Sequence, residues 1–181
     1  MKIKIVCISG KAQHGKDTVA NYIKDFLMEK NHSVLITHYE DFVEYICKIF
    51  FDWNGLKDED WRNLLQYAGT DIIRGQEPEY LCRFAKGVAD MFGMNWEYIL
   101  IPDCRFPNEI DIWTKDDKYD VTHIRVERPN YNGNLTIEQQ NHISETALDK
   151  IAPDVTIINN GSLKDLRLVA RHLADLCLHY L

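Results

Sequence analysis

Five short apolar runs are interspersed with five segments in which apolar residues recur at helical spacing. The short runs are rich in β-branched residues, which is typical of strands buried on both faces of a sheet. They occupy residues 3–8, 34–37, 98–101, 121–126 and 155–158. The segments with helical spacing cover residues 19–27, 42–50, 61–67, 81–92 and 163–180.

This order predicts an α/β fold, in which helices cover both faces of a parallel sheet and residues 1–181 form a single domain. Ligands of such sheets bind beyond the carboxyl ends of the strands. Polar residues follow each apolar run, and we expect them to gather at that edge. They are residues 10–18, 38–41, Asp103 with Arg105, Glu127 with Arg128, and 159–162.

Composition narrows the range of functions. Net charge is −7 and no block of lysine or arginine occurs, so we expect no binding to nucleic-acid polymers. No apolar stretch is long enough to span a membrane, and the first residues do not resemble a signal peptide. The five cysteines contain no Cys-x-x-Cys pair. We expect reduced thiols in a cytoplasmic protein.

Residues 10–18 show the pattern of a phosphate-binding P-loop. Two glycines five residues apart and a lysine stand between the first apolar run and a helical segment. Glycines let the backbone bend around a phosphate, and Lys16 would reach the outer phosphates of ATP. A nearby hydroxyl, Thr18, would bind Mg²⁺. The predicted ATP contacts are Gly10, Lys11, Ala12, Gln13, His14, Gly15, Lys16, Asp17 and Thr18.

The loop departs from the strict pattern in one place. Asp17 stands where a serine or threonine usually follows the lysine, and Thr18 comes one position later. A Gly-Lys-x-Thr ending resembles small-molecule and nucleoside monophosphate kinases rather than GTPases. The alternative is an ordinary glycine-rich turn. His14 either touches a phosphate or contributes only its backbone.

A second group of functional residues follows the third apolar run. Asp103 at the end of a buried strand can hold Mg²⁺, and Arg105 can donate two hydrogen bonds to a phosphate. The alternative is structural: Asp103 would cap a turn and Arg105 would pair with Glu109.

Four motifs occur in the order of a known family. They are Gly15-Lys16-Asp17-Thr18, Gly69-Thr70-Asp71 with Arg74, Asp103-x-Arg105-Phe106-x-Asn108-Glu109, and His142-x-Ser144-Glu145-Thr146-Ala147-Leu148. Together they resemble the phage-type deoxynucleoside monophosphate kinases and their bacterial relatives. The resemblance covers residues 3–173. It implies the three-layer P-loop kinase fold, with a five-stranded parallel sheet in the order 2-3-1-4-5.

The resemblance also implies a reaction, in which the γ-phosphoryl group of ATP moves to a deoxynucleoside 5′-monophosphate with Mg²⁺ present. Residues from about 52 to 80 would form a helical insertion that binds the acceptor, and those from about 129 to 149 a lid-like segment. The implied catalytic residues are Lys16, Asp103, Arg105 and Arg128, with Thr18 and Asp103 on the metal. The acceptor would meet Asp41, Arg74, Arg105, Glu109 and Glu145, and Asn160 would flank the adenine.

Most of these roles have a structural alternative. Arg74 could form a surface pair with Asp71 or Glu77, and Arg128 could pair with Glu127. Three further residues have local alternatives: Asp41 as a helix cap, Ser144 as a cap with Glu145 behind it, and Asn160 as part of a plain turn.

The activity and assembly also have alternatives. One is a P-loop kinase of another metabolite, such as dephospho-coenzyme A or phosphomevalonate. Another is a regulatory module that binds ATP without turnover. The accepted base is not predicted. The resemblance is compatible with a homodimer and with a protein encoded by a virus.

Overall fold

The computed structural model describes residues 2–56, 59–131 and 135–180, except the side chains of residues 59, 62 and 176–180. Its centre is a five-stranded sheet in the order β2-β3-β1-β4-β5, and all four strand pairs of this sheet are parallel. The strands are β1 (Ile3–Ser9), β2 (Val34–Ile36), β3 (Tyr98–Cys104), β4 (Tyr119–Glu127) and β5 (Val155–Ile158). The predicted sheet and its strand order are confirmed.

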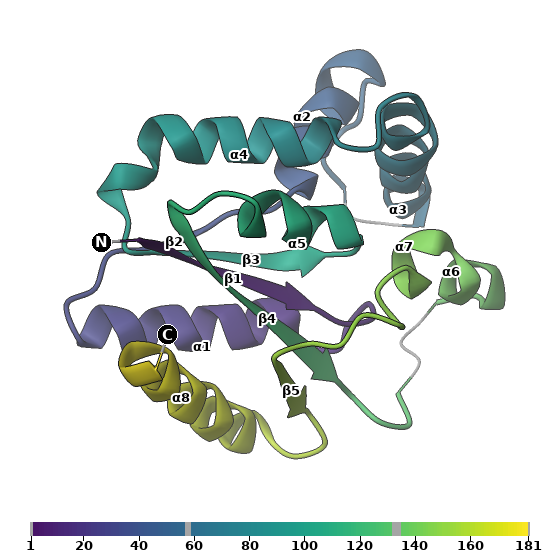
Figure 1. Cartoon of the computed structure of the whole chain (residues 1–181). Coiled ribbons are helices and arrows are strands. Elements are labelled where there is room, and N and C mark those ends of the chain that lie inside the picture. The colour runs from purple at the N-terminus through teal and green to yellow at the C-terminus, as the bar shows by residue number, and fades with distance from the viewer. Residues whose placement is uncertain (1, 57–58, 132–134, 181) are drawn as a thin grey trace.

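Helices cover both faces of the sheet (Figure 1). One face packs against α1 (Lys16–Glu29) and α8 (Leu163–Tyr180). The other packs against α2 (Glu40–Phe50), α4 (Tyr80–Phe92) and α5 (Pro107–Thr114). The remaining elements are α3 (Glu59–Gln66), the π-helix η1 (Tyr67–Arg74), the 3₁₀-helix η2 (Gly93–Asn95), α6 (Ile137–Asn141) and α7 (Ile143–Thr146). Within the described residues, no helix is both long enough and apolar enough to cross a membrane.

The strands are apolar without interruption because both of their faces are buried. In β1, Val6 and Ile8 join the core beneath α1 and α8, whereas Ile5 and Cys7 join the core beneath α2, α4 and α5. Successive side chains of a strand point to opposite faces, so an internal strand of this sheet requires apolar residues at consecutive positions.

Several elements differ from the sequence prediction, among them the short elements η2, α6 and α7, which were not predicted. Helix α5 was not predicted, because its eight residues are too few for a clear apolar period; it begins with Pro107, and the Glu109 carboxylate accepts the backbone N–H of Phe106, the residue before the helix. The helix predicted over residues 61–67 is longer, because η1 continues it to Arg74. Strand β3 also extends to Cys104, so Asp103 is the second-last residue of the strand and does not follow it.

Candidate active site

The P-loop joins β1 to α1 and contains glycine where the backbone requires it. Gly10 has a φ of +142°, and a Cβ atom there would lie 2.3 Å from the Val126 carbonyl oxygen. Gly15 has a φ of +98°, and a Cβ atom there would lie 2.8 Å from Nδ2 of Asn159. Such φ values are unfavourable for L side chains, and neither position has space for one.

We expect Gly10→Ala to lower the free energy of unfolding by roughly 2–5 kcal/mol, because backbone strain adds to the collision with Val126. Urea unfolding followed by circular dichroism measures the loss. Gly55→Ala is the matched control, because Gly55 also has a positive φ of +85°, but its added Cβ would meet no described residue within 4 Å. Equal losses in the two variants would show that contact with β4 is not what requires glycine at position 10.

Lys16 is the first residue of α1, and its side chain turns back into the bend of the P-loop. Its Nζ donates a hydrogen bond to the Lys11 carbonyl oxygen at 3.1 Å, and the residue is buried. Burial lowers the pKa of Lys16 to about 7, and the nearby Arg105 guanidinium contributes to the same effect. A bound phosphate would favour the charged form of this amine.

Three of the four predicted cations meet in one cavity of about 560 Å³ at the carboxyl ends of the strands, and the fourth, Arg128, does not line it. Lys16 lines it from the P-loop, Arg105 from the end of β3 and Arg74 from the end of η1. Three acids, Asp103, Glu109 and Glu145, share its wall, together with Asp17 and Asp41. Residues far apart in sequence therefore surround a space with room for phosphate groups.

Arg74 is paired with Glu109, not with Asp71 or Glu77. Its Nη2 contacts Oε1 of Glu109, and its guanidinium lies 4.2 Å from the centre of the Phe106 ring. Oε2 of Glu109 accepts the backbone N–H groups of Arg105 and Phe106. Glu109 was predicted to meet the acceptor. In the structure its carboxylate contacts the Arg74 guanidinium and the backbone N–H groups after β3, and it orients both.

Burial raises the pKa of Glu109 to about 7, and the Arg74 guanidinium opposes that rise. The carboxylate thus depends on Arg74 to remain charged. The alternative in which Arg105 forms an ion pair with Glu109 is wrong, because Nη1 of Arg105 donates to Oε1 of Glu145 at 2.7 Å.

Asp103 has one carboxylate oxygen bonded and one without a partner. Oδ2 accepts the Glu40 backbone N–H at the start of α2 (2.9 Å). The structural alternative, in which Asp103 caps a turn, therefore accounts for one of its two carboxylate oxygens. Oδ1 is buried and has no hydrogen-bond partner among the described residues. Burial raises the pKa of Asp103, while His38 acts against this rise. A buried oxygen of this kind is suited to a cation or a metal-bound water.

No group of three or more metal-ligating side chains occurs in the described part of the chain. Any Mg²⁺ here would therefore take most of its ligands from phosphate oxygens and water, which is usual for this ion at nucleotide sites.

His38 is a residue of this site that the sequence analysis did not assign. Its Nε2 lies 3.2 Å from Oδ1 of Asp17, and its backbone N–H donates to Oδ2 of Asp41. The hydrogen bond with Asp17 raises the pKa of His38 to about 9. The available signal was its position two residues after β2, shortly before Glu40 and Asp41. Asp41 contacts His38 at the start of α2 and also lines the cavity.

Glu145 lies against the P-loop. Its Oε2 accepts the Ala12 backbone N–H at 3.0 Å while its other oxygen holds Arg105. A second acid of the same segment, Asp149, pairs with Lys11 at 3.1 Å. The alternative in which Ser144 caps a helix is wrong: His142 is the N-cap of α7, and its ring nitrogen accepts the Ser144 N–H.

We expect Glu145→Gln to tighten ATP binding about 5-fold, corresponding to about 1 kcal/mol, since the carboxylate competes with phosphate for the Ala12 N–H. Isothermal titration calorimetry measures the Kd. Asp149→Asn is the matched control, because this acid is more exposed and touches only a lysine side chain. Weaker ATP binding by the Glu145 variant would contradict competition and assign Glu145 a supporting role.

The end of β4 contributes Arg128, whose guanidinium lies 4.0 Å from the centre of the Tyr131 ring. Its backbone N–H donates to Nδ1 of His14, and Nε2 of His14 lies 3.1 Å from the Tyr131 carbonyl oxygen. The His14 side chain therefore connects the P-loop to the residues after β4. A second cavity of about 440 Å³ adjoins this region and is lined by both Arg128 and Arg105.

Two other predictions concern the edges of the site. Asn160 is exposed, and it is Asn159 that contacts the P-loop, through its Nδ2 and the His14 carbonyl oxygen at 2.9 Å. Thr18 lies in the first turn of α1. Part of the lid-like segment, residues 132–134, lies outside the described residues.

Comparison with known proteins gives one family. A family model described as deoxynucleotide monophosphate kinase matches residues 30–169. The deoxynucleotide monophosphate kinase of Enterobacteria phage T4 is 33% identical over 117 residues, which cover 62% of this chain and 45% of that relative. The chain thus matches less than half of the length of the phage protein. The P-loop precedes the family match, so its identification rests on its own sequence and geometry.

Solved structures share the architecture at low identity. The APS kinase of Mycobacterium tuberculosis, in complex with AMPPNP and APS, has a TM-score of 0.51 at 16% identity, with 98% of each chain covered. The shikimate kinase of Aquifex aeolicus has a TM-score of 0.52 at 13% identity and covers 98% of this chain and 99% of its own. These similarities identify the fold as that of P-loop kinases.

Proposed function

Since this chain belongs to the deoxynucleotide monophosphate kinase family, we propose that it transfers the γ-phosphoryl group of ATP to a deoxynucleoside 5′-monophosphate. The products are ADP and the deoxynucleoside diphosphate. The observation that carries this proposal is the single cavity lined by Lys16, Arg74 and Arg105. Two anionic substrates must lie end to end for direct transfer, and these cations provide charge for both of them.

On the donor side, residues 10–18 hold the triphosphate through backbone N–H groups, and Lys16 reaches its outer phosphates. Thr18 and Asp103 would hold Mg²⁺, which neutralises charge on the phosphate oxygens when it is bound. The unpartnered oxygen of Asp103 supports this assignment. Asn159 and Asn160 flank the adenine from the turn after β5.

On the acceptor side, Arg74 holds the monophosphate and Arg105 lies between the two phosphate sites. The helical insertion from about 52 to 80 contributes Leu65, Gln66 and Thr70 to the same cavity, so we assign it to the nucleoside. Asp41 faces the sugar or base from α2. Arg128 stabilises the transferring group when the segment from about 129 to 149 closes over the site.

Activity with a panel of acceptors tests this proposal. A coupled assay of ADP release should show turnover with at least one deoxynucleoside monophosphate, and chelation of Mg²⁺ should abolish it. Dephospho-coenzyme A and phosphomevalonate belong in the panel as acceptors of other P-loop kinases. Turnover with one of these alone, or tight ATP binding without turnover, would replace the proposal with a metabolite kinase or a regulatory module. The phage relative supports a virus-encoded enzyme that acts in the cytoplasm of its host.

A further inference from the structure

Two side chains of the P-loop hold the residues that follow β4, and the function proposed above does not use these contacts. Nδ1 of His14 accepts the backbone N–H of Arg128 at 3.1 Å, and Nε2 of His14 lies 3.1 Å from the Tyr131 carbonyl oxygen. A carbonyl oxygen can only accept a hydrogen bond, so Nε2 carries the ring proton and Nδ1 does not. Both ring nitrogens are therefore engaged, and neither is left for a phosphate.

Tyr131 is held at both of its ends by the P-loop. Its carbonyl oxygen meets His14, and its hydroxyl donates a hydrogen bond to Oε1 of Gln13 at 2.9 Å. The Arg128 guanidinium lies over the same ring, 4.0 Å from its centre. A cation within about 6 Å of an aromatic ring centre is attracted to the face of the ring. The P-loop thus fixes the surface on which the Arg128 side chain rests.

A glycine would suit the backbone at position 13 better than the glutamine that stands there. Gln13 has a φ of +62°, in the left-handed region that other residues rarely adopt. Glycine would take this conformation without strain, but the bond to the Tyr131 hydroxyl would be lost. The neighbouring His14 is buried, with 9% of its surface exposed. Water therefore competes little for the hydrogen bonds of its ring.

The Arg128 guanidinium has no acidic partner among the residues that the structure describes, so its orientation depends on Tyr131. It lines the second cavity together with Arg105, which also lines the main cavity. A long side chain loses rotamer freedom when a substrate fixes it, and this loss weakens the interaction. Packing on Tyr131 removes part of that freedom before a substrate binds.

We propose that His14 is a positioning residue, which fixes the Arg128 guanidinium relative to the P-loop and so relative to the phosphates bound there. This inference rests on the proposed function, in which Arg128 stabilises the transferring group. His14 itself touches no reacting atom. It acts through the Arg128 backbone on one side and through Tyr131 on the other. Such anchoring matters because a displacement of about 1 Å can lower a rate about 100-fold.

Removal of the His14 ring should lower kcat and leave substrate binding almost unchanged. We expect His14→Ala to lower kcat about 10-fold and to keep the KM of each substrate within about 2-fold, because the guanidinium is still present and is only misplaced. Circular dichroism and the thermal unfolding midpoint check the fold. His14→Asn should keep at least about half of the wild-type kcat, since its amide oxygen can replace Nδ1 as the acceptor of the Arg128 N–H.

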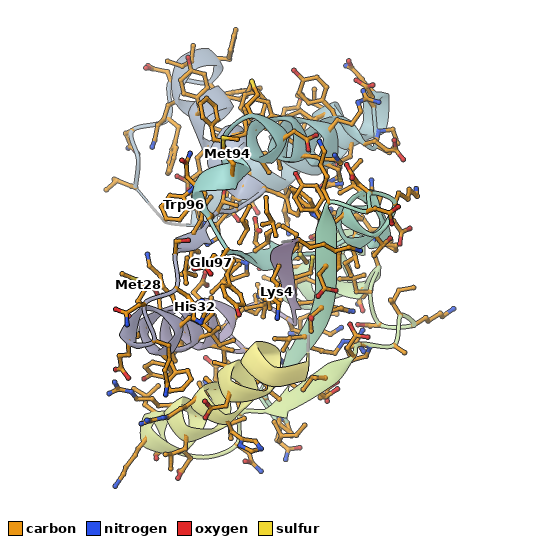
Figure 2. The ribbon with its side chains drawn as sticks, turned by 60° about the vertical axis from the view of Figure 1, so that its left-hand side comes forward. Lys4, Met28, His32, Met94, Trp96 and Glu97 are labelled. Atoms are coloured by element: carbon orange, nitrogen blue, oxygen red, sulfur yellow. The ribbon has the colours of Figure 1, made fainter. Side chains whose placement is uncertain are left out.

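His32→Ala is the matched control for the loss of a histidine ring. His32 pairs with Glu97, which precedes β3 and therefore lies at the opposite end of the sheet from the P-loop (Figure 2). Its replacement should keep kcat within about 2-fold, because no group of the site depends on it.

A double-mutant cycle separates positioning from a direct contact with phosphate. In an Arg128→Ala background, His14→Ala should change kcat by less than about 2-fold, because the group that His14 positions is already absent. If His14 instead acts on a phosphate itself, the two losses multiply. The cycle therefore gives opposite results for the two roles of this ring.

An NMR measurement tests the contact without catalysis. In ¹⁵N-labelled protein, a scalar coupling across the hydrogen bond should connect the Arg128 amide to Nδ1 of His14. The inference is overturned if the wild type lacks this coupling, if His14→Asn is no more active than His14→Ala, or if the cycle shows losses that multiply. Each of these results is compatible with turnover by the wild type. Absence of turnover with every acceptor would instead overturn the proposed function, and the coupling would still be present.

Discussion

Replacing Lys16 by alanine is expected to lower kcat/KM at least ~10³-fold, because this amine is the cation that reaches into the P-loop bend. Its Nζ lies 3.1 Å from the Lys11 carbonyl oxygen and borders the main cavity. A positive side chain beside the transferring phosphoryl group acts chiefly by stabilising the transition state. Most of the loss should therefore fall on kcat. Initial rates of ADP release at saturating ATP and acceptor measure it.

The fold should survive this change. Burial already lowers the pKa of Lys16 to about 7, so removal of the amine deletes a group whose charged form the folded chain disfavours. The thermal unfolding midpoint checks this. Lys11→Ala is the matched control in the same loop, since Lys11 is half-exposed and pairs with Asp149; we expect less than a ~10-fold effect. Near-normal turnover by the Lys16 variant would remove the P-loop from the mechanism.

Arg74→Ala should raise the KM for the acceptor by about 10–100-fold and leave the KM for ATP within about 2-fold, because a hydrogen bond to a charged group contributes about 1.5–3 kcal/mol. Arg74 lines the cavity from η1, whereas Lys16 lines it from the P-loop. Initial rates with each substrate varied in turn measure the two constants. An equal rise in both would reassign Arg74.

A change in stability complicates this variant, because Arg74 is paired with the buried Glu109. Removing one member of a buried ion pair costs about 3–5 kcal/mol. The double variant Arg74→Ala with Glu109→Gln separates the two effects. We expect it to recover most of the unfolding free energy while its acceptor KM stays high. Recovery of the KM as well would mean that Arg74 acts only through the fold.

The local sequence pattern was sufficient to predict the sheet and the P-loop. Each strand is an unbroken apolar run because both sheet faces are covered, and this feature is readable in the chain alone. Glycine occupies two of the positive-φ positions of the P-loop, and this backbone preference is local; the contacts with Val126 and Asn159 that leave no space for a side chain there are not. Helix α5 was missed, since eight residues give too little periodicity; its main signals are Pro107 at its first position and Glu109 in its first turn.

The sequence alone thus determined which residues stand at the carboxyl ends of the strands, and hence which residues can share a site. Only the tertiary structure decided their partners. Arg74 pairs with Glu109, 35 positions away, and Glu145 bonds to Ala12, 133 positions away. These pairings follow from the order of the strands and from the cost of leaving a buried charge alone, and neither depends on spacing along the chain.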